Sequence, residues 1–244
     1  MLHDFKDDKF THIVFPLYGP TLYDVIHSNE LPFTIKEIRT IARQLIETTM
    51  LLHDNQLLHS DLKPDNILLN RFYKNETKPE FYRKADIVLC DFGTVYAEYE
   101  FEQFEITTLP YRAPDVVLGH KIGYPCDVWS IGCTIFELAT SYCLFNVKSV
   151  EELIVLINET LGPFTKTQIE RIEHVHNKHK VYLEEEKENF NDLSGKVVNV
   201  NNILGHLKQE EKDLYDVIIK MLIIDPEKRI SLNEVPKLPF FTKE

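Results

Sequence analysis

The stretch from Asp127 to Ala139 constrains the fold most, because it is apolar on nearly every side. It has the length of a helix but lacks a polar stripe. A helix without a polar face has to be enclosed by other elements. We therefore expect a central, buried helix here, within one large domain built by a chain of 244 residues. Asp127 at its start is expected to accept free backbone amides of the helix N-terminus.

Apolar periodicity predicts the elements around this helix. Thr34 and Glu37 have the spacing of a capping box, and the apolar residues behind them predict a long helix ending near His53. Ser231 and Glu234 have the same spacing and predict a short last helix, limited by Pro236 and Pro239. Other helices are expected over residues 22–27 and 150–161 and around 214–222, and short strands over 10–17, 67–69 and 85–90. The predicted fold class is therefore α+β and mainly helical, with Phe15 in the core.

Three polar segments are predicted to lie outside this core. Residues 70–84 and 164–200 are charged and weakly periodic, which favours exposed insertions. Residues 94–110 have the composition of a mobile surface segment.

The composition excludes several classes of protein. A net charge of −12 argues against affinity for nucleic acid backbone and suits a cationic partner or simple solubility. No apolar run is long enough to span a bilayer, and the acidic start does not resemble a signal peptide. The four cysteines, Cys90, Cys126, Cys133 and Cys143, lack paired metal spacing and indicate a reducing, intracellular compartment.

The stretch from Leu57 to Leu69 places a polar loop between two apolar runs. Asp61, Lys63 and Asn66 supply a carboxylate, a cation and a carboxamide within six positions. Phosphoryl transfer requires this set: a carboxylate near the attacking hydroxyl, a cation on the phosphoryl group and an oxygen ligand for magnesium. If the strands over 67–69 and 85–90 pair as a hairpin, Asp91 lies beside Asn66, and the two offer oxygen ligands to one hard cation.

Five ordered motifs resemble the eukaryotic protein kinase family across nearly the whole chain. They are His59–Asn66, Asp91–Gly93, Tyr111–Asp115, Asp127–Gly132 and Arg229. The resemblance implies one kinase-like domain over residues 1–244: a remnant of the small lobe and hinge over 1–17, and a helical large lobe over 18–244.

Within the kinases, Tyr111–Pro114 resembles the CMGC group. The small hydroxyl residue Ser60, the insertion at 70–84 and the stretches Val14–Asp24 and Pro125–Cys133 are most similar to the LAMMER (CDC-like) branch. The signature of that branch is poorly kept in Glu151–Gly162, so the DYRK branch remains an alternative. It is disfavoured because the late tyrosine pair of its activation segment is absent.

The resemblance assigns roles to individual residues. It implies that Asp61 deprotonates the substrate hydroxyl, that Lys63 contacts the transferred phosphoryl group, and that Asn66 and Asp91 hold Mg²⁺. It implies that ATP lies against the gatekeeper Phe15 and the hinge residues Pro16 and Tyr18. Structural support is implied for His59, for Thr108 between the activation segment and the loop, for Asp127 beneath the loop, and for a buried pair of Asp115 with Arg229.

The chain departs from the family at the nucleotide cover, because it contains neither G-x-G nor Val-Ala-x-Lys before the hinge. One explanation is a late start codon or a fragment of an active kinase; the other is a pseudokinase that serves as a protein-binding module. The intact set Asp61, Lys63, Asn66 and Asp91 favours the first. Weak ATP binding and slow transfer are expected from the chain as given.

The resemblance also implies partners and location. It implies protein substrates with basic or Arg/Ser-rich segments, phosphorylated on serine or threonine and also on tyrosine in a dual-specificity enzyme. A monomer is expected, with a nuclear location and without direct binding to nucleic acid or membrane.

Overall fold

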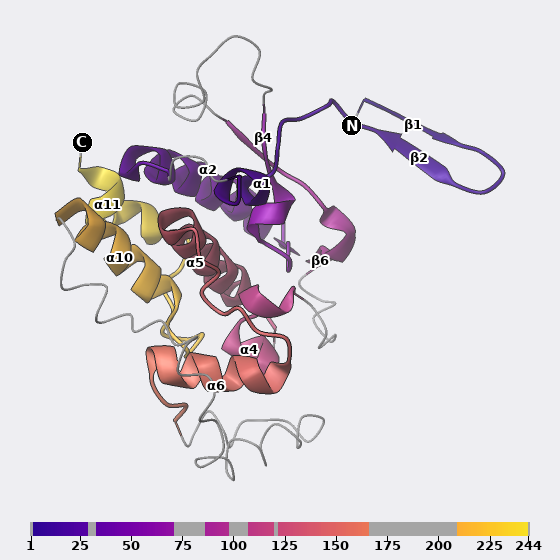
Figure 1. The fold of residues 1–244 in the computed structure, drawn as a ribbon. Coiled ribbons are helices and arrows are strands. Elements are labelled where there is room, and N and C mark those ends of the chain that lie inside the picture. The colour runs from indigo at the N-terminus through magenta and orange to yellow at the C-terminus, as the bar shows by residue number, and fades with distance from the viewer. Residues whose placement is uncertain are drawn as a thin grey trace.

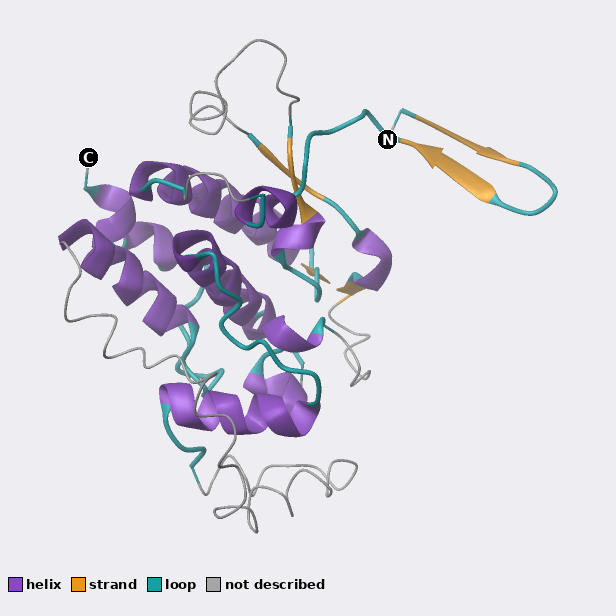
Figure 2. Ribbon diagram, viewed as in Figure 1, coloured by secondary structure: helices purple, strands orange, loops and turns teal. Residues whose placement is uncertain are grey.

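A computed structural model describes residues 2–28, 33–70, 86–97, 107–119, 122–165 and 209–243. Helices form the body of the molecule, and short two-stranded sheets lie at one end (Figures 1 and 2). The segments predicted to be exposed lie largely outside the described residues, at 71–85, 98–106 and 166–208. Among the described helices, none is long and apolar enough to cross a membrane.

Helix α5 (Pro125–Thr140) is the predicted central helix, and it is buried from Cys126 to Leu138. It packs against α2 (Ile35–Asp54) and α10 (Gln209–Met221), as Figure 1 shows. Gly132 permits a close approach of α5 and α10, since a Cβ added there would lie 3.0 Å from the Cβ of Met221.

Helix α2 begins at the predicted capping box. Thr34 Oγ1 accepts from the amide of Glu37 at 3.3 Å, and the Glu37 carboxylate accepts from the amide of Thr34 at 2.6 Å. The helix ends at Asp54, close to the predicted position, and thereby delivers the chain into the polar loop that follows.

The remaining helices are short or peripheral. Helix α6 (Val150–Leu161) is capped by Ser149 and stops at Gly162, which has a positive φ of 102°. The other α-helices in the described part of the chain are α1 (Leu22–Ile26), α4 (Pro114–Val117) and α11 (Pro239–Thr242). Helix α1 has a capping box of its own, formed by Thr21 and Asp24, that the sequence reasoning missed.

The prediction that a short last helix begins at Ser231 is wrong. The hydrogen bonds from the Ser231 amide and hydroxyl to Glu234 are present at 3.1 and 2.7 Å, but they close a turn. A 3-10 helix follows over Val235–Lys237. Pro236 and Pro239 have no amide hydrogen, so a regular helix through them would lose its hydrogen bonds.

The strands of the described residues form three antiparallel pairs. Strand β4 (Ile67–Leu69) pairs with β5 (Ile87–Leu89), which confirms the predicted hairpin, with Ile67 opposite Leu89. Strand β3 (Leu57–Leu58) pairs with β6 (Tyr96–Ala97), a contact that local sequence did not predict.

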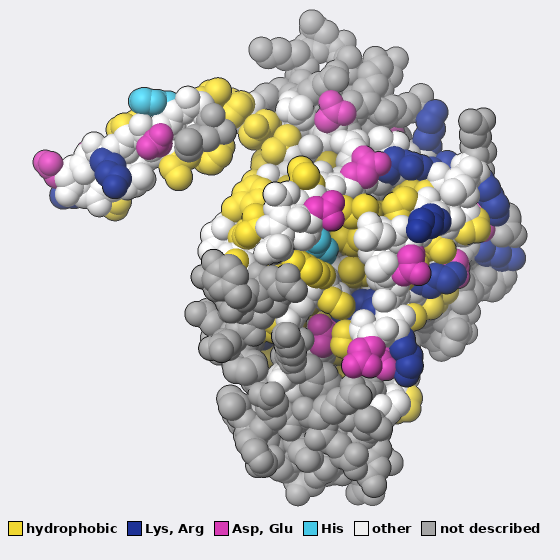
Figure 3. All heavy atoms as spheres, turned by 180° about the vertical axis from the view of Figure 1, so that it is seen from behind, with side chains coloured by type: hydrophobic (Ala, Val, Ile, Leu, Met, Phe, Trp, Pro, Cys, Tyr) yellow, Lys and Arg dark blue, Asp and Glu magenta, His cyan; other side chains and the backbone are white. Residues whose placement is uncertain are grey.

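Strands β1 (His3–Lys6) and β2 (Thr11–Val14) form a ribbon that projects from the body, and apolar side chains cover much of it (Figures 1 and 3). Phe15, at its base, is 58% exposed, so the prediction that it lies in the core is wrong. The periodicity of the segment predicted a strand correctly, but the described residues provide no layer that covers it.

Candidate active site

The polar loop after β3 rests on a single buried carboxylate. Asp127 Oδ1 accepts from the amide of Ser60 at 2.9 Å, and Oδ2 accepts from the amide of His59 at 3.0 Å. His53 Nε2 lies 3.0 Å from the same Oδ2. Since Asp127 is fully buried, these contacts fix the loop backbone from below.

The expectation that Asp127 caps its own helix is therefore wrong. Helix α5 begins at Pro125, two residues earlier than predicted, and its N-terminus has no side-chain cap. The carboxylate is instead directed at the loop, in the position that the family resemblance implied.

His59 ties the loop to the segment that carries Asp91. Its Nε2 lies 3.2 Å from the carbonyl oxygen of Cys90, and its Nδ1 accepts from the amide of Asp61 at 3.3 Å. The ring is fully buried and lies against Phe92. These contacts give His59 a structural position between the two segments.

Ser60 adopts a left-handed backbone conformation, with φ of 66°. Its hydroxyl donates to the carbonyl of Thr94, and Thr94 Oγ1 donates to the carbonyl of His59 at 3.4 Å. Such a conformation costs about 1–3 kcal/mol in a residue with a side chain, so the surrounding contacts must hold it.

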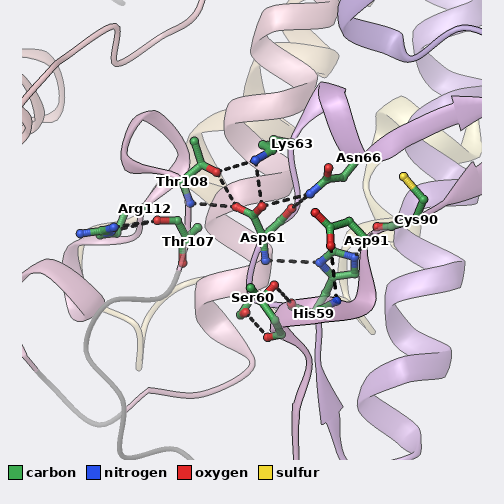
Figure 4. Close-up of polar contacts among 12 residues, drawn as sticks. His59, Ser60, Asp61, Lys63, Asn66, Cys90, Asp91, Thr107, Thr108 and Arg112 are labelled. Atoms are coloured by element: carbon green, nitrogen blue, oxygen red, sulfur yellow. Dashed lines mark hydrogen bonds and ion pairs between the residues drawn. The ribbon is translucent and has the colours of Figure 1, made fainter. Parts of the chain in front are cut away.

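Asp61 is the centre of a closed hydrogen-bond network (Figure 4). Its Oδ1 accepts from Thr108, from the amide at 2.8 Å and from the hydroxyl at 2.6 Å. Its Oδ2 accepts from Lys63 Nζ at 2.8 Å and from Asn66 Nδ2 at 3.0 Å. Burial alone would raise the pKa of Asp61, but the hydrogen bonds from Lys63 and Thr108 outweigh it and hold the pKa below its usual value. Asp61 is therefore an ionised carboxylate at neutral pH.

The segment that begins at Thr107 reaches this network through Thr108. Lys63 Nζ also donates to Thr108 Oγ1 at 2.6 Å, so Asp61, Lys63 and Thr108 contact one another. The preceding residue, Thr107, has φ of 73°, and its carbonyl accepts two hydrogen bonds from Arg112 at 2.8 and 3.2 Å. Arg112 was not singled out from the sequence, because its partner is a backbone atom.

Asn66 and Asp91 fit a magnesium site. Asn66 Nδ2 donates to the carbonyl and the carboxylate of Asp61, which leaves its Oδ1 as the acceptor atom. Asp91 lies beside it in Figure 4, at a left-handed position with φ of 60°, and the Cys90 amide donates to the Asn66 carbonyl at 2.9 Å. Magnesium takes one or two such oxygens from the protein and shares the phosphate oxygens of its nucleotide.

The residue before Asp91 is Cys90, and burial together with the adjacent Asp91 carboxylate raises the pKa of its thiol. In the described part of the chain, no three His, Cys, Asp or Glu side chains are grouped as a metal cluster.

The expected ion pair of Asp115 and Arg229 is present. Arg229 Nη2 lies 2.7 Å from Asp115 Oδ1, and both side chains are essentially inaccessible to solvent. The guanidinium also donates to the carbonyls of Pro125, Ile223 and Ile224. The pair therefore joins α4, the start of α5 and the turn after α10.

The expected adenine contacts lie apart from this network. Phe15 and Pro16 are exposed and Tyr18 is partly buried, and among the described residues they make no hydrogen bond to the polar loop after β3. Gly19 and Pro20 connect their segment to β4 through two backbone hydrogen bonds with Leu69, at 2.7 and 3.0 Å. This anchors the segment to the hairpin that precedes Asp91.

Comparisons with known proteins agree with this arrangement. The family model described as "protein kinase domain" matches residues 1–241. The chain is 34% identical over 256 residues to the human dual specificity protein kinase CLK1, covering 99% of this chain and 52% of that protein. It is 33% identical to the serine/threonine-protein kinase AFC1 of Arabidopsis thaliana, covering 95% of this chain and 55% of that protein.

Two further comparisons extend this similarity. The chain is 32% identical to the dual specificity protein kinase lkh1 of Schizosaccharomyces pombe, with 99% of this chain and 37% of that protein covered. It thus spans about half or less of the length of these relatives. A crystal structure of a kinase domain superposes with a TM-score of 0.78 at 26% identity, covering 92% of this chain and 71% of that one.

Proposed function

Because the chain belongs to the protein kinase family, with LAMMER-type kinases of the CMGC group among its relatives, we propose that it transfers phosphate from ATP to protein hydroxyls. The observation that carries this proposal is the environment of Asp61. Its carboxylate is ionised, fixed by four hydrogen bonds and placed beside Lys63. A base in such a position suits deprotonation of a serine or threonine hydroxyl.

Each polar residue of the loop then has a distinct task. Asp61 accepts the proton of the substrate hydroxyl, while Thr108 keeps its carboxylate in one orientation. Lys63 offers its ammonium group to the transferred phosphoryl group, and it releases a contact to Thr108 or Asp61 when it does so. Asn66 and Asp91 would hold Mg²⁺, which neutralises the phosphate charge of ATP.

We propose one kinase domain over residues 1–244, in which 1–17 are small-lobe and hinge elements and 18–244 form the large lobe. Phe15, Pro16 and Tyr18 would face the adenine. The 244 residues contain no G-x-G sequence, so they lack one of the groups that cover the phosphates. We expect weak use of ATP by the chain as given.

The proposed substrates are proteins with basic or Arg/Ser-rich segments, and the proposed state is a monomer acting in the nucleus. The net charge of −12 and the exposed Asp65, four residues after the catalytic Asp61, support a cationic substrate. CLK1 and lkh1 are named dual specificity kinases, which supports tyrosine as a second acceptor here.

A transfer assay with radiolabelled ATP and a basic serine peptide tests this proposal. We expect Asp61→Ala and Asp91→Ala to abolish the signal, whereas Glu159→Gln, an exposed change on α6, should leave it intact. Equal signal in the unmodified chain and the three variants would refute the proposed kinase activity.

A second candidate is a non-catalytic module that binds basic segments, and the missing G-x-G favours it. It predicts peptide binding that is unaffected by Mg²⁺ and ATP, without transfer in any of these proteins. The Asp91→Ala protein separates the candidates further. A binding module loses nothing at that position, whereas a kinase loses a magnesium ligand.

A further inference from the structure

A pocket lined in part by His53, whose imidazole contacts Asp127, lies next to the support of the catalytic loop. It has a volume of ≈ 370 Å³ and lies between the end of α2, the start of α5 and the turn at residues 226–233. This size is at the lower end of the range for small-molecule sites, about 300–1,000 Å³. Its walls combine apolar and polar side chains, among them Met50, His53, Asp54, Tyr124, Val128 and Leu232.

The electrostatics of the pocket favour a cation. Asp54 is exposed at the last position of α2 and makes no ion pair within the described residues. The C-terminal end of a helix adds partial negative charge at the same place. The one arginine in the wall, Arg229, is compensated by its contact with Asp115, so the pocket retains the charge of Asp54.

The apolar part of the wall favours a ligand with a small hydrophobic body. Met50, Val128 and Leu232 contribute aliphatic surface, and Tyr124 contributes an aromatic ring. An ammonium group can also lie favourably against such a ring.

One residue of the wall is linked to the catalytic loop through Asp127. The His53 imidazole is mostly buried, packs against Tyr124 with ring centroids 4.4 Å apart, and contacts Asp127 Oδ2 at 3.0 Å. Nε2 faces a carboxylate oxygen that also accepts from the amide of His59, so His53 is the donor in this contact. The same Asp127 holds the amides of His59 and Ser60, so a displacement of His53 changes the support of a loop that includes a strained residue.

We propose that this pocket binds a small protonated amine with an apolar body, and that His53 and Asp127 transmit its binding to the catalytic loop. This site is separate from the proposed nucleotide and substrate sites, and its test does not need kinase activity. It would give the domain a regulatory input from a metabolite-sized amine.

Binding is tested by calorimetry on the full chain with 2-phenylethylamine and its neutral isostere 2-phenylethanol. We expect the amine to bind about tenfold more tightly than the alcohol, and Asp54→Asn to remove this difference, since a charge-assisted contact changes affinity by about that factor. Glu159→Gln, which removes an exposed carboxylate on α6, serves as the matched control. Equal affinity for the two compounds, or an unchanged preference in Asp54→Asn, would overturn the assignment.

Transmission is tested by the amide signals of the same protein in ¹H–¹⁵N spectra. The amine should shift the signals of His59 and Ser60, while Gly162 at the end of α6 should stay in place. In His53→Ala, the amine should still bind but the signals of His59 and Ser60 should no longer respond. Binding to the unmodified chain without a shift at His59 and Ser60 would refute the link.

Discussion

Removing the guanidinium of Arg229 should be among the most damaging single changes in the chain. Arg229→Ala leaves the Asp115 carboxylate buried without its cation, and it leaves three carbonyls, those of Pro125, Ile223 and Ile224, without their donor. Breaking a buried ion pair in this way costs roughly 3–5 kcal/mol. For a chain of this size, that corresponds to a fall in Tm of roughly 6–20 °C.

Urea denaturation followed by circular dichroism measures this free energy of unfolding. Lys228→Ala is the matched control, because Lys228 pairs with Asp225 at 2.9 Å but is 77% exposed. That change should cost about 0–1 kcal/mol, as surface pairs do. A cost below about 1 kcal/mol for Arg229→Ala would mean that the pair is not buried.

The double variant Asp115→Leu/Arg229→Met separates charge from hydrogen bonding. Replacing both members removes the unpaired carboxylate, and it should therefore cost less than Arg229→Ala alone. The three backbone carbonyls still lose their donor, so the double variant should not regain full stability. A double variant less stable than the single one would contradict the assignment of the cost to the stranded charge.

Three further changes probe the site and its support. Thr108→Val should raise the pKa of Asp61 towards its usual value, because it removes a hydroxyl donor at 2.6 Å, and the acidic limb of the rate–pH profile should move to higher pH. The pKa of Asp61 is lower in the folded chain than in the unfolded chain, where it is about 4, so ionised Asp61 stabilises the fold at pH values above about 4. This stabilisation is lost as the pH falls through the folded pKa. Thr108→Val should therefore also weaken the dependence of Tm on acidic pH. Asp127→Asn should lower kcat by about 100-fold with little change in KM, because an amide cannot accept both loop amides and a displaced base reacts slowly. Gly132→Ala should destabilise the chain by up to about 2 kcal/mol in urea denaturation, since overpacking against Met221 costs about 1–3 kcal/mol and the gain in helix propensity is about 1 kcal/mol.

Local patterns predicted the elements that local physics determines. The capping box of Thr34 and Glu37, the enclosed helix α5 and the hairpin of β4 with β5 depend on spacing within one segment, and all three are present. Ser231 and Glu234 also make their expected hydrogen bonds, yet a turn forms instead of a helix. A capping box satisfies amides at a helix start, but it cannot propagate a helix through prolines.

Contacts between distant segments were harder to predict. The pairing of His53 with Asp127 spans 74 positions, and of the two only Asp127 was singled out from the sequence. The prediction for Phe15 failed for a related reason: a strand pattern specifies which residues alternate, whereas burial depends on what packs against them. The structure brings together the motif residues Asp61, Lys63, Asn66 and Thr108. Their proximity could be predicted because the resemblance to a known family carries long-range information that spacing lacks.

The buried charges around the candidate site favour the proposed kinase function over a binding module. Asp127, Asp115 and Arg229 are all buried, and stability alone would often be served as well by apolar residues of similar size. Each of these charges instead holds part of the candidate site in place: Asp127 accepts from two amides of the loop that carries Asp61, and the Asp115–Arg229 pair joins α4 to the start of α5. A protein that only bound basic peptides would need surface carboxylates, but it would not need a strained serine and two loop amides held on a buried aspartate. The buried charge of Asp127 and the strained backbone of Ser60 both cost free energy, and a requirement to hold Asp61 in a fixed position explains why they are present.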